Sequence, residues 1–110
     1  VVSSSWRWYV EHCLRELGMY EDAAVIVTGS DGLPLKPAPA PYQAAARVFR
    51  PAPPGAVLAV EDSCSGVRSA VAAGLACAAV YNPDSGAQDL SPARWRLNSL
   101  YELPALLDGN

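Results

Sequence analysis

The chain has 110 residues, of which 51% are hydrophobic, and it carries a formal net charge of −3. This hydrophobic share is enough for the core of one small domain and argues against a disordered chain. Nucleic acid and membrane surfaces are excluded as main partners, because the sequence has no basic cluster and no apolar run of membrane-spanning length. The three cysteines form no CxxC pair, which favours location in the reducing cytoplasm.

The first predicted elements are a strand end and a helix. Val1 and Val2 are apolar and β-branched, as if they were the end of a strand, and we expect an upstream part to be missing. A helix is predicted over residues 6–17, with apolar positions on one face and Gly18 as its stop. The three serines at positions 3–5 can cap this helix.

A short strand, a turn and a second helix follow. Residues 25–27 form an apolar strand, which the turn-rich stretch 28–32 ends. The next helix should start near Pro41, since proline is tolerated in the first helical turn, and three prolines from Pro51 onward end it. The apolar run 56–60 shows no polar alternation, which is typical of a parallel strand covered on both faces.

The last third of the chain repeats this alternation. We predict a helix over 65–73 that stops at Gly74, a strand over 76–80, a short strand over 95–98 and a helix over 99–107. Strands that alternate with helices indicate βαβ units. The predicted fold class is therefore α/β, a Rossmann-like three-layer sandwich with a parallel sheet.

Candidate site residues come just after the predicted strands. Ligands of parallel α/β sheets bind beyond the carboxyl ends of the strands. Ser3 and Ser4 follow the first strand, Lys36 lies in the loop after the second, and Glu61 and Asp62 end the third. Hydroxyl groups can hold phosphate oxygens, a lysine can neutralise them, and adjacent carboxylates can hold Mg²⁺.

Each of these residues also has a purely structural interpretation. Ser3 and Ser4 can act only as helix caps, and Glu61 and Asp62 can cap the helix that follows them. Lys36 can be an ordinary solvated lysine, although it is the single lysine among eight basic residues.

Three segments in order resemble the haloacid dehalogenase (HAD) superfamily, in its branch of phosphoglycolate-phosphatase-like and β-phosphoglucomutase-like enzymes. They are Val2-Ser3-Ser4-Ser5 for the second motif, Lys36-Pro37-Ala38-Pro39 for the third, and Glu61-Asp62-Ser63-Cys64-Ser65-Gly66-Val67 for the fourth. Together they extend over most of the chain.

The resemblance implies a role for each residue. Ser3, with Ser4 beside it, would bind the transferring phosphoryl group, and Lys36 would neutralise that group and the nucleophile. Asp62 would ligate Mg²⁺, with Glu61 as a second acid on the metal side. The implied function is a Mg²⁺-dependent phosphohydrolase, a phosphatase or phosphomutase that acts on a small phosphorylated metabolite through an aspartyl-phosphate intermediate.

One motif of the family has no counterpart here. The nucleophilic aspartate belongs to an Asp-x-Asp motif that should precede Ser3 by a long stretch, and only two residues precede Ser3. We therefore expect residues 1–110 to be the C-terminal portion of a HAD-like core domain that is incomplete at the N-terminus and lacks the first strand and the cap domain. The missing strand would lie between the strands that end at Ser3 and Glu61, which leaves two unpaired edges. Alone, this chain should show little or no turnover.

Two other functions stay open at this point. The chain can be a truncated or pseudoenzyme α/β domain that binds Mg²⁺ and phosphate, or a protein partner, without catalysis. A 2-haloacid dehalogenase is a weaker alternative, because that chemistry needs no metal and would leave Glu61 and Asp62 idle. The sequence leaves open the substrate, the choice between hydrolase and mutase, and the oligomeric state.

Overall fold

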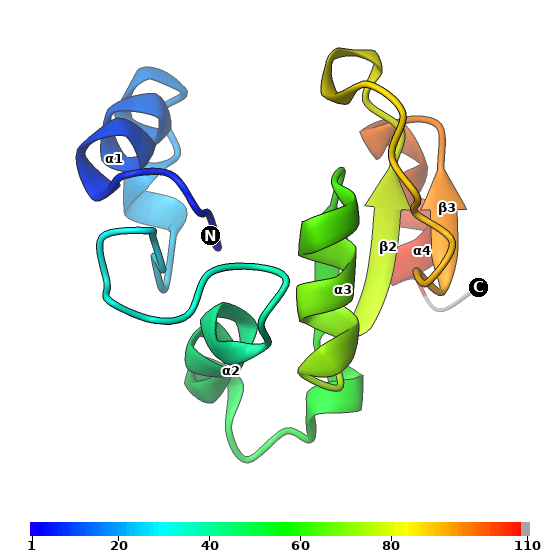
Figure 1. The fold of residues 1–110 in the computed structure, drawn as a ribbon, viewed down its shortest axis with the longest axis horizontal. Coiled ribbons are helices and arrows are strands. Elements are labelled where there is room, and N and C mark those ends of the chain that lie inside the picture. Colours follow the sequence, from blue (N-terminus) through cyan, green and yellow to red (C-terminus); the bar gives the residue numbers. More distant parts are fainter. Residues whose placement is uncertain (109–110) are drawn as a thin grey trace.

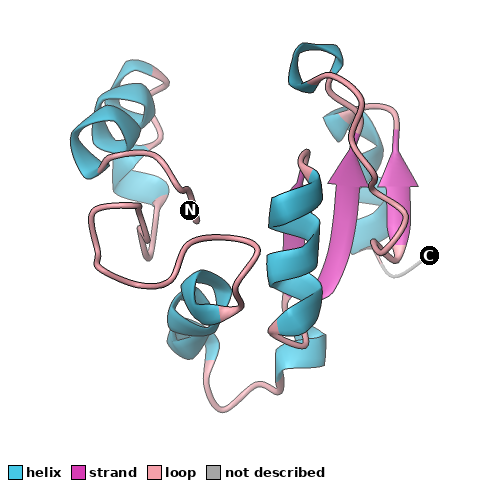
Figure 2. Ribbon diagram, in the orientation of Figure 1, coloured by secondary structure: helices cyan, strands magenta, loops and turns pink. Residues whose placement is uncertain are grey.

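The computed structural model describes residues 1–108 and shows two groups of elements beside each other (Figures 1 and 2). The N-terminal group contains α1 (Arg7–Glu16) and a 3₁₀ turn, and the second group contains the sheet. The elements of the second group are α2 (Ala40–Ala46), β1 (Leu58–Glu61), α3 (Cys64–Ala72), β2 (Ala76–Val80), β3 (Trp95–Leu97) and α4 (Leu103–Leu107). None of the described helices is long and apolar enough to cross a bilayer.

The sheet confirms the predicted α/β architecture. Its strand order is β1-β2-β3, and both pairs are parallel, with Leu58 opposite Ala76 and Ala78 opposite Trp95. Helix α3 lies in front of the sheet in Figure 1 and α4 lies behind it, so that helices cover both faces. The strands predicted over 76–80 and 95–98 are found at β2 and β3, whereas β1 begins two residues later than predicted because residues 54–56 form a 3₁₀ turn.

The hydrophobic core lies between α3 and the sheet. Val67 and Ala70 of α3 and Ala79 of β2 are fully buried, and Cys77 is 1% exposed. Tyr42 brings α2 into the same cluster, since its ring packs with these side chains. The sheet group therefore contains most of the apolar packing, and small residues in β2 let α3 approach it closely.

Helix α1 is capped differently from the prediction. Its first N–H group, that of Arg7, donates to Ser30 Oγ at 2.9 Å, while the N-cap residue Trp6 makes no side-chain cap bond. The prediction that the serines at positions 3–5 cap this helix is wrong, because a hydroxyl from the following loop takes that place. The Arg7 guanidinium also contacts Asp31 at 2.9 Å, which fixes α1 to the same loop.

Helix α3 lies within one residue of its prediction, whereas α2 ends at Ala46 and α4 begins at Leu103 instead of residue 99, because 3₁₀ turns over 47–49 and 100–102 take the remaining residues. Helix α2 starts at Ala40, with Pro41 in its first turn. Helix α3 is capped by Ser63, whose Oγ accepts from the N–H of Gly66 at 3.1 Å. Gly74 follows α3 with a φ of +84°, a backbone conformation that glycine adopts without a steric penalty.

The strand predicted over residues 25–27 forms only one parallel bridge, between Val2 and Val27. The N–H of Ser3 donates to Val27 O at 2.9 Å, and the N–H of Val27 donates to Val1 O at 2.8 Å. No described residue joins this pair to the sheet. The two unpaired edges that the sequence predicts are therefore present, one at Val2 and one at β1.

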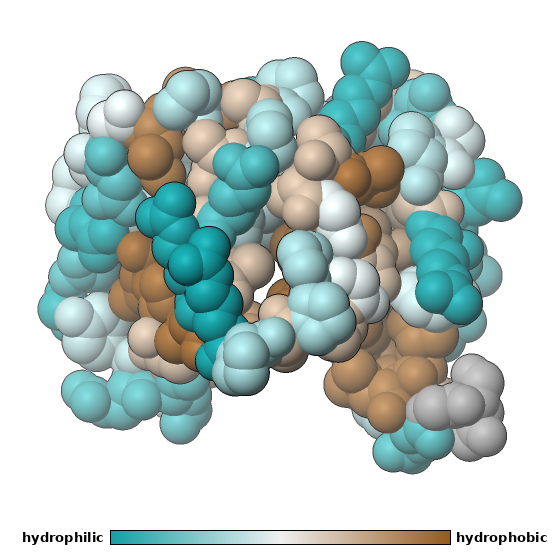
Figure 3. All heavy atoms as spheres, turned by 90° about the horizontal axis from the view of Figure 1, so that it is seen from below, coloured by the Kyte–Doolittle hydropathy of each residue, from teal (hydrophilic) through white to brown (hydrophobic). Residues whose placement is uncertain are grey.

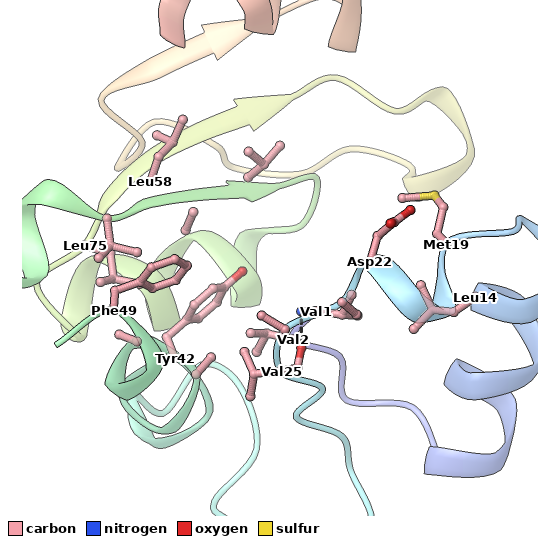
Figure 4. A pocket seen from close by; sticks show the side chains of 17 residues that line it. Val1, Val2, Leu14, Met19, Asp22, Val25, Tyr42, Phe49, Leu58 and Leu75 are labelled. Carbon is pink, nitrogen blue, oxygen red and sulfur yellow. Dashed lines mark hydrogen bonds between the residues drawn. The ribbon is translucent and has the colours of Figure 1, made fainter.

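A cavity of ≈ 590 Å³ separates these two edges. Figure 4 shows Val1, Val2 and Val25 on one side of it and Leu58 on the other. Seen from below, the molecule shows patches of hydrophobic side chains on both sides of a central hollow (Figure 3). Tyr42, Ala45 and Ala46 of α2 also line this cavity.

Candidate active site

The centre of the candidate site is a buried ion pair between Lys36 and Glu61. Lys36 Nζ lies 2.6 Å from Glu61 Oε1 and 2.8 Å from the carbonyl oxygen of Val2. The two side chains are only 10% and 7% exposed. Lys36 thus connects the residue before Ser3 with the end of β1, and the interpretation of Lys36 as a solvated lysine is wrong.

Tyr42 and Gly66 complete the environment of Glu61. The Tyr42 hydroxyl donates a short hydrogen bond to Glu61 Oε1. Burial, followed by the charge of Glu61, raises the pKa of Tyr42, so this phenol stays protonated and remains a donor. A Cβ atom at Gly66 would overlap the Glu61 carboxylate, so only glycine leaves this carboxylate in place.

Asp62 lies on the side of the site that faces solvent. Its Oδ2 accepts hydrogen bonds from Asn82 Nδ2 at 2.8 Å and from Ser85 Oγ at 3.0 Å. The bond from Asn82 contributes most to a lowered pKa of Asp62, and Ser85 and the charge of Lys36 act in the same direction. The Asp62 carboxylate is therefore ionised well into the acid range and available to a cation.

The serine segment is held by the loop that follows Val27. Ser3 is half-buried and its Oγ accepts the N–H of Ser5 at 3.1 Å, while Ser4 is exposed. The N–H of Gly29 donates to Ser5 O at 2.8 Å, and a Cβ atom at Gly29 would overlap the carbonyl of Ser4. A glycine is thus required for this close approach of two backbones.

The structure brings some of the predicted site residues into contact and leaves others apart. Lys36 and Glu61 are in direct contact, and Lys36 also bonds the residue before Ser3. Among the described residues, no hydrogen bond joins the Ser3 or Ser4 hydroxyl to Lys36 or to either carboxylate. Ser63, and neither Glu61 nor Asp62, caps α3, so the interpretation of these two acids as a helix cap is wrong.

The two adjacent carboxylates fit a Mg²⁺ ion in their chemistry. Mg²⁺ in proteins is usually held by one or two carboxylates and completes its octahedron with water and substrate phosphate. Glu61 and Asp62 supply such a pair, and within residues 1–108 no group of three or more His, Cys, Asp or Glu side chains gathers at this site or elsewhere. A hollow of ≈ 530 Å³ lies at the end of β1, and Glu61, Asp62, Tyr81 and Tyr101 are among the residues that line it.

Three contributors to this site escaped the sequence prediction. Tyr42 lies in the helix predicted to start near Pro41, and nothing in the local pattern places its hydroxyl on Glu61. Asn82 and Ser85 follow β2 at the same edge of the sheet as Asp62. The rule that ligands bind beyond strand ends also indicates Asn82, which follows β2.

Comparison with known proteins identifies the family to which the chain belongs. A family model described as haloacid dehalogenase-like hydrolase matches residues 1–80. "Putative phosphatase YhcW" of Bacillus subtilis is 36% identical over 108 residues, which are 96% of this chain and 48% of that protein. The chain thus spans about half the length of this relative.

Solved structures show the same partial coverage. CbbY from Rhodobacter sphaeroides in complex with phosphate superposes with a TM-score of 0.84 at 31% identity, over 94% of this chain and 47% of CbbY. A "putative beta-phosphoglucomutase from Thermotoga maritima" superposes with a TM-score of 0.77 at 26% identity, over 96% of this chain and 49% of that one. The chain, with its parallel sheet and its phosphatase-like fold, belongs to the haloacid dehalogenase-like hydrolase family.

Proposed function

We propose that this chain forms part of a Mg²⁺-dependent phosphohydrolase, a phosphatase or phosphomutase, that acts on a small phosphorylated metabolite. One observation carries the proposal. Lys36 Nζ bridges the carbonyl of Val2, which precedes Ser3, and the carboxylate of Glu61, which precedes Asp62. This contact supports a site at the carboxyl ends of the strands, where ligands of such sheets bind.

Each residue has a proposed task. Ser3 and Ser4 would bind the phosphoryl oxygens, and Lys36 would neutralise the charge that develops on them during transfer. Asp62 and Glu61 would hold Mg²⁺, which supplies further neutralisation of the phosphate oxygens when it is bound. Asn82 and Ser85 would keep the Asp62 carboxylate oriented and ionised through their hydrogen bonds.

We further propose that residues 1–110 are the C-terminal portion of a HAD-like core domain. The first strand, the nucleophilic aspartate that would form the aspartyl-phosphate, and the cap domain would belong to another part of the protein. Within residues 1–108, the carboxylate bonded to Lys36 is that of Glu61, which the proposal assigns to the metal. The chain alone would therefore bind Mg²⁺ and phosphate but show little or no turnover.

Two solved structures of one relative support a small phosphorylated substrate. CbbY was crystallised in complex with phosphate, and a variant of it in complex with xylulose-(1,5)bisphosphate. The hollow of ≈ 530 Å³ beside Glu61 and Asp62 has the size of a small-molecule site.

The test is a titration of the purified chain with MgCl₂, and then with inorganic phosphate, followed by backbone amide NMR shifts. Asp62→Asn should abolish the Mg²⁺-dependent shifts at the end of β1. Asp89→Asn, which changes an exposed acid, is the matched control and should leave them unchanged. Equal shifts in both variants, or no shifts in the unmodified chain, would refute the metal assignment.

A phosphate titration with a turnover assay separates the enzyme from a non-catalytic binding domain. Lys36→Met should weaken phosphate-dependent shifts around Ser3, whereas Arg47→Met, at an exposed position, should not. Hydrolysis of p-nitrophenyl phosphate by the full-length protein but not by this chain would support the proposed division of the core. A full-length protein that binds both ions without hydrolysis of any phosphate ester would favour the non-catalytic alternative.

A further inference from the structure

The loop that follows β2 holds the Asp62 carboxylate from one side. Asn82 Nδ2 and Ser85 Oγ both donate to the same carboxylate oxygen, Oδ2, at 2.8 and 3.0 Å. The side-chain oxygen of Asn82 accepts the N–H of Asp84 at 3.0 Å, which fixes the orientation of this amide group. Both bonds from the loop reach Oδ2, so Oδ1 is the oxygen that the loop leaves to a cation.

Gln88 closes this loop onto the segment that follows Asp62. Its Nε2 donates to the carbonyl oxygen of Ser85 at 2.9 Å, and its Oε1 accepts the N–H of Cys64, the first residue of α3, at 2.8 Å. Gly86 lets the chain turn back between Ser85 and Gln88, since its φ of +69° lies in the left-handed region. One side-chain amide therefore joins the loop to the helix that begins two residues after Asp62.

Hydrogen bonds, more than apolar packing, hold the loop in this place. None of the side chains from residue 83 to residue 89 is buried. Asp62 and residues 86–90 are among those that line a hollow of ≈ 430 Å³, and the partly buried Leu90 is the first side chain after this stretch that packs against the core. Because apolar contacts are few, the loss of one of these bonds should let the loop move away from Asp62.

We propose that Gln88 is a positioning residue for the metal site: through Ser85 it keeps the donors of the loop on Oδ2 of Asp62 and so fixes the orientation of this carboxylate. The inference rests on the proposed role of Asp62 as a Mg²⁺ ligand, and it adds a residue that touches neither the metal nor the phosphate. The alternative is that Gln88 only caps α3. A cap needs the acceptor Oε1 alone, whereas the positioning role also needs the donor Nε2.

The substitution Gln88→Glu distinguishes these two roles. The new carboxylate still offers an acceptor to the N–H of Cys64, and a negative charge is favourable at a helix N-terminus, so the cap would be retained. Its second oxygen cannot donate to the Ser85 carbonyl, so the positioning would be lost. The added charge by itself would attract Mg²⁺ more strongly, which is the opposite of the effect that the positioning role predicts.

The first measurement is a titration of the ¹⁵N-labelled chain with MgCl₂, followed at the backbone amides of residues 61–64. In Gln88→Glu the Kd for Mg²⁺ should rise by about threefold to tenfold, the range expected for one orienting hydrogen bond. Gln88→Ala should raise the Kd as well. Gln43→Glu adds the same charge at an exposed position of α2 and should leave the Kd unchanged, and urea unfolding checks that each variant is folded.

The second measurement needs no metal. The side-chain NH₂ resonances of Asn82 report its bond to Asp62, and in Gln88→Glu they should shift toward the values of a solvent-exposed amide, while Gln43→Glu leaves them in place. Unchanged Asn82 resonances, or a Kd in Gln88→Glu that is unchanged or lower, would overturn the proposal and leave Gln88 as a cap. If the unmodified chain binds no Mg²⁺, the metal assignment of the proposed function fails, and the Asn82 resonances alone decide whether Gln88 positions the Asp62 carboxylate.

Discussion

The Lys36–Glu61 pair allows a sharp prediction on stability. The substitution Lys36→Met keeps the length of the aliphatic side chain but removes its charge, which leaves a carboxylate that is 7% exposed without a counter-ion. Removal of one partner from a buried ion pair typically costs about 3–5 kcal/mol. Tyr42 still donates to Glu61, so we expect the lower end, a loss of about 3 kcal/mol in the free energy of unfolding.

This loss is large for a domain of this size. Natural domains are stable by about 5–15 kcal/mol, so Lys36→Met should remove a substantial share of the total. At roughly 4 °C per kcal/mol, the midpoint of thermal unfolding should fall by about 12 °C. The double variant Lys36→Met/Glu61→Gln contains neither charge and should recover most of the loss, to within about 1 kcal/mol of the unmodified chain.

The assay is urea unfolding followed by far-ultraviolet circular dichroism at pH 7, for the two single variants and the double variant. Arg47→Met is the control, since it removes a positive charge from an exposed position and should change stability by less than about 0.5 kcal/mol. A loss below about 0.5 kcal/mol in Lys36→Met would refute the reasoning. Strict additivity of the two single losses in the double variant would refute it as well.

Two further predictions concern the neighbours of the two carboxylates. Gly66→Ala should displace the Glu61 carboxylate and lower the free energy of unfolding by about 1–3 kcal/mol, despite the better helix propensity of alanine. Gly55→Ala is the control, because a Cβ atom there meets open space, and it should be neutral or slightly stabilising. Equal melting temperatures of the two variants would contradict this prediction. Asn82→Ala should raise the pKa of Asp62 toward its ordinary value, because it removes the main stabilisation of the ionised carboxylate. The stability that the ionised Asp62 contributes should then be smaller, and on acidification it should be lost at a higher pH than in the unmodified chain. An unchanged carboxyl ¹³C titration of Asp62 would contradict this prediction.

Much of the fold follows from local patterns in the sequence. The unbroken apolar runs predict β1 and β2 to within two residues, because strands covered on both faces need no polar alternation. Gly18 and Gly74 end their helices with positive φ, as predicted. Such signals are reliable because a single residue and its neighbours determine them.

The remaining features depend on contacts between distant parts of the chain. The cap of α1 comes from Ser30, which is 23 residues away from Arg7, and no local pattern distinguishes it from the three serines beside the helix. The same holds for the hydroxyl of Tyr42, which donates to Glu61, 19 residues away. Sequence reasoning therefore predicted the charged residues of the candidate site better than the polar groups that orient them.

The position of the core has a consequence for how the molecule opens. The sheet group contains the fully buried side chains Val67, Ala70 and Ala79, whereas α1 buries only Val10 and Leu14. Free energies of local opening follow the apolar contacts that an element makes, and contiguous elements open as cooperative units. Residues 1–31, which the contacts of Arg7 with Ser30 and Asp31 join, should therefore detach and reattach as a unit while α3 and β2 stay folded, and the native state would alternate between a joined and a parted arrangement of one intact core.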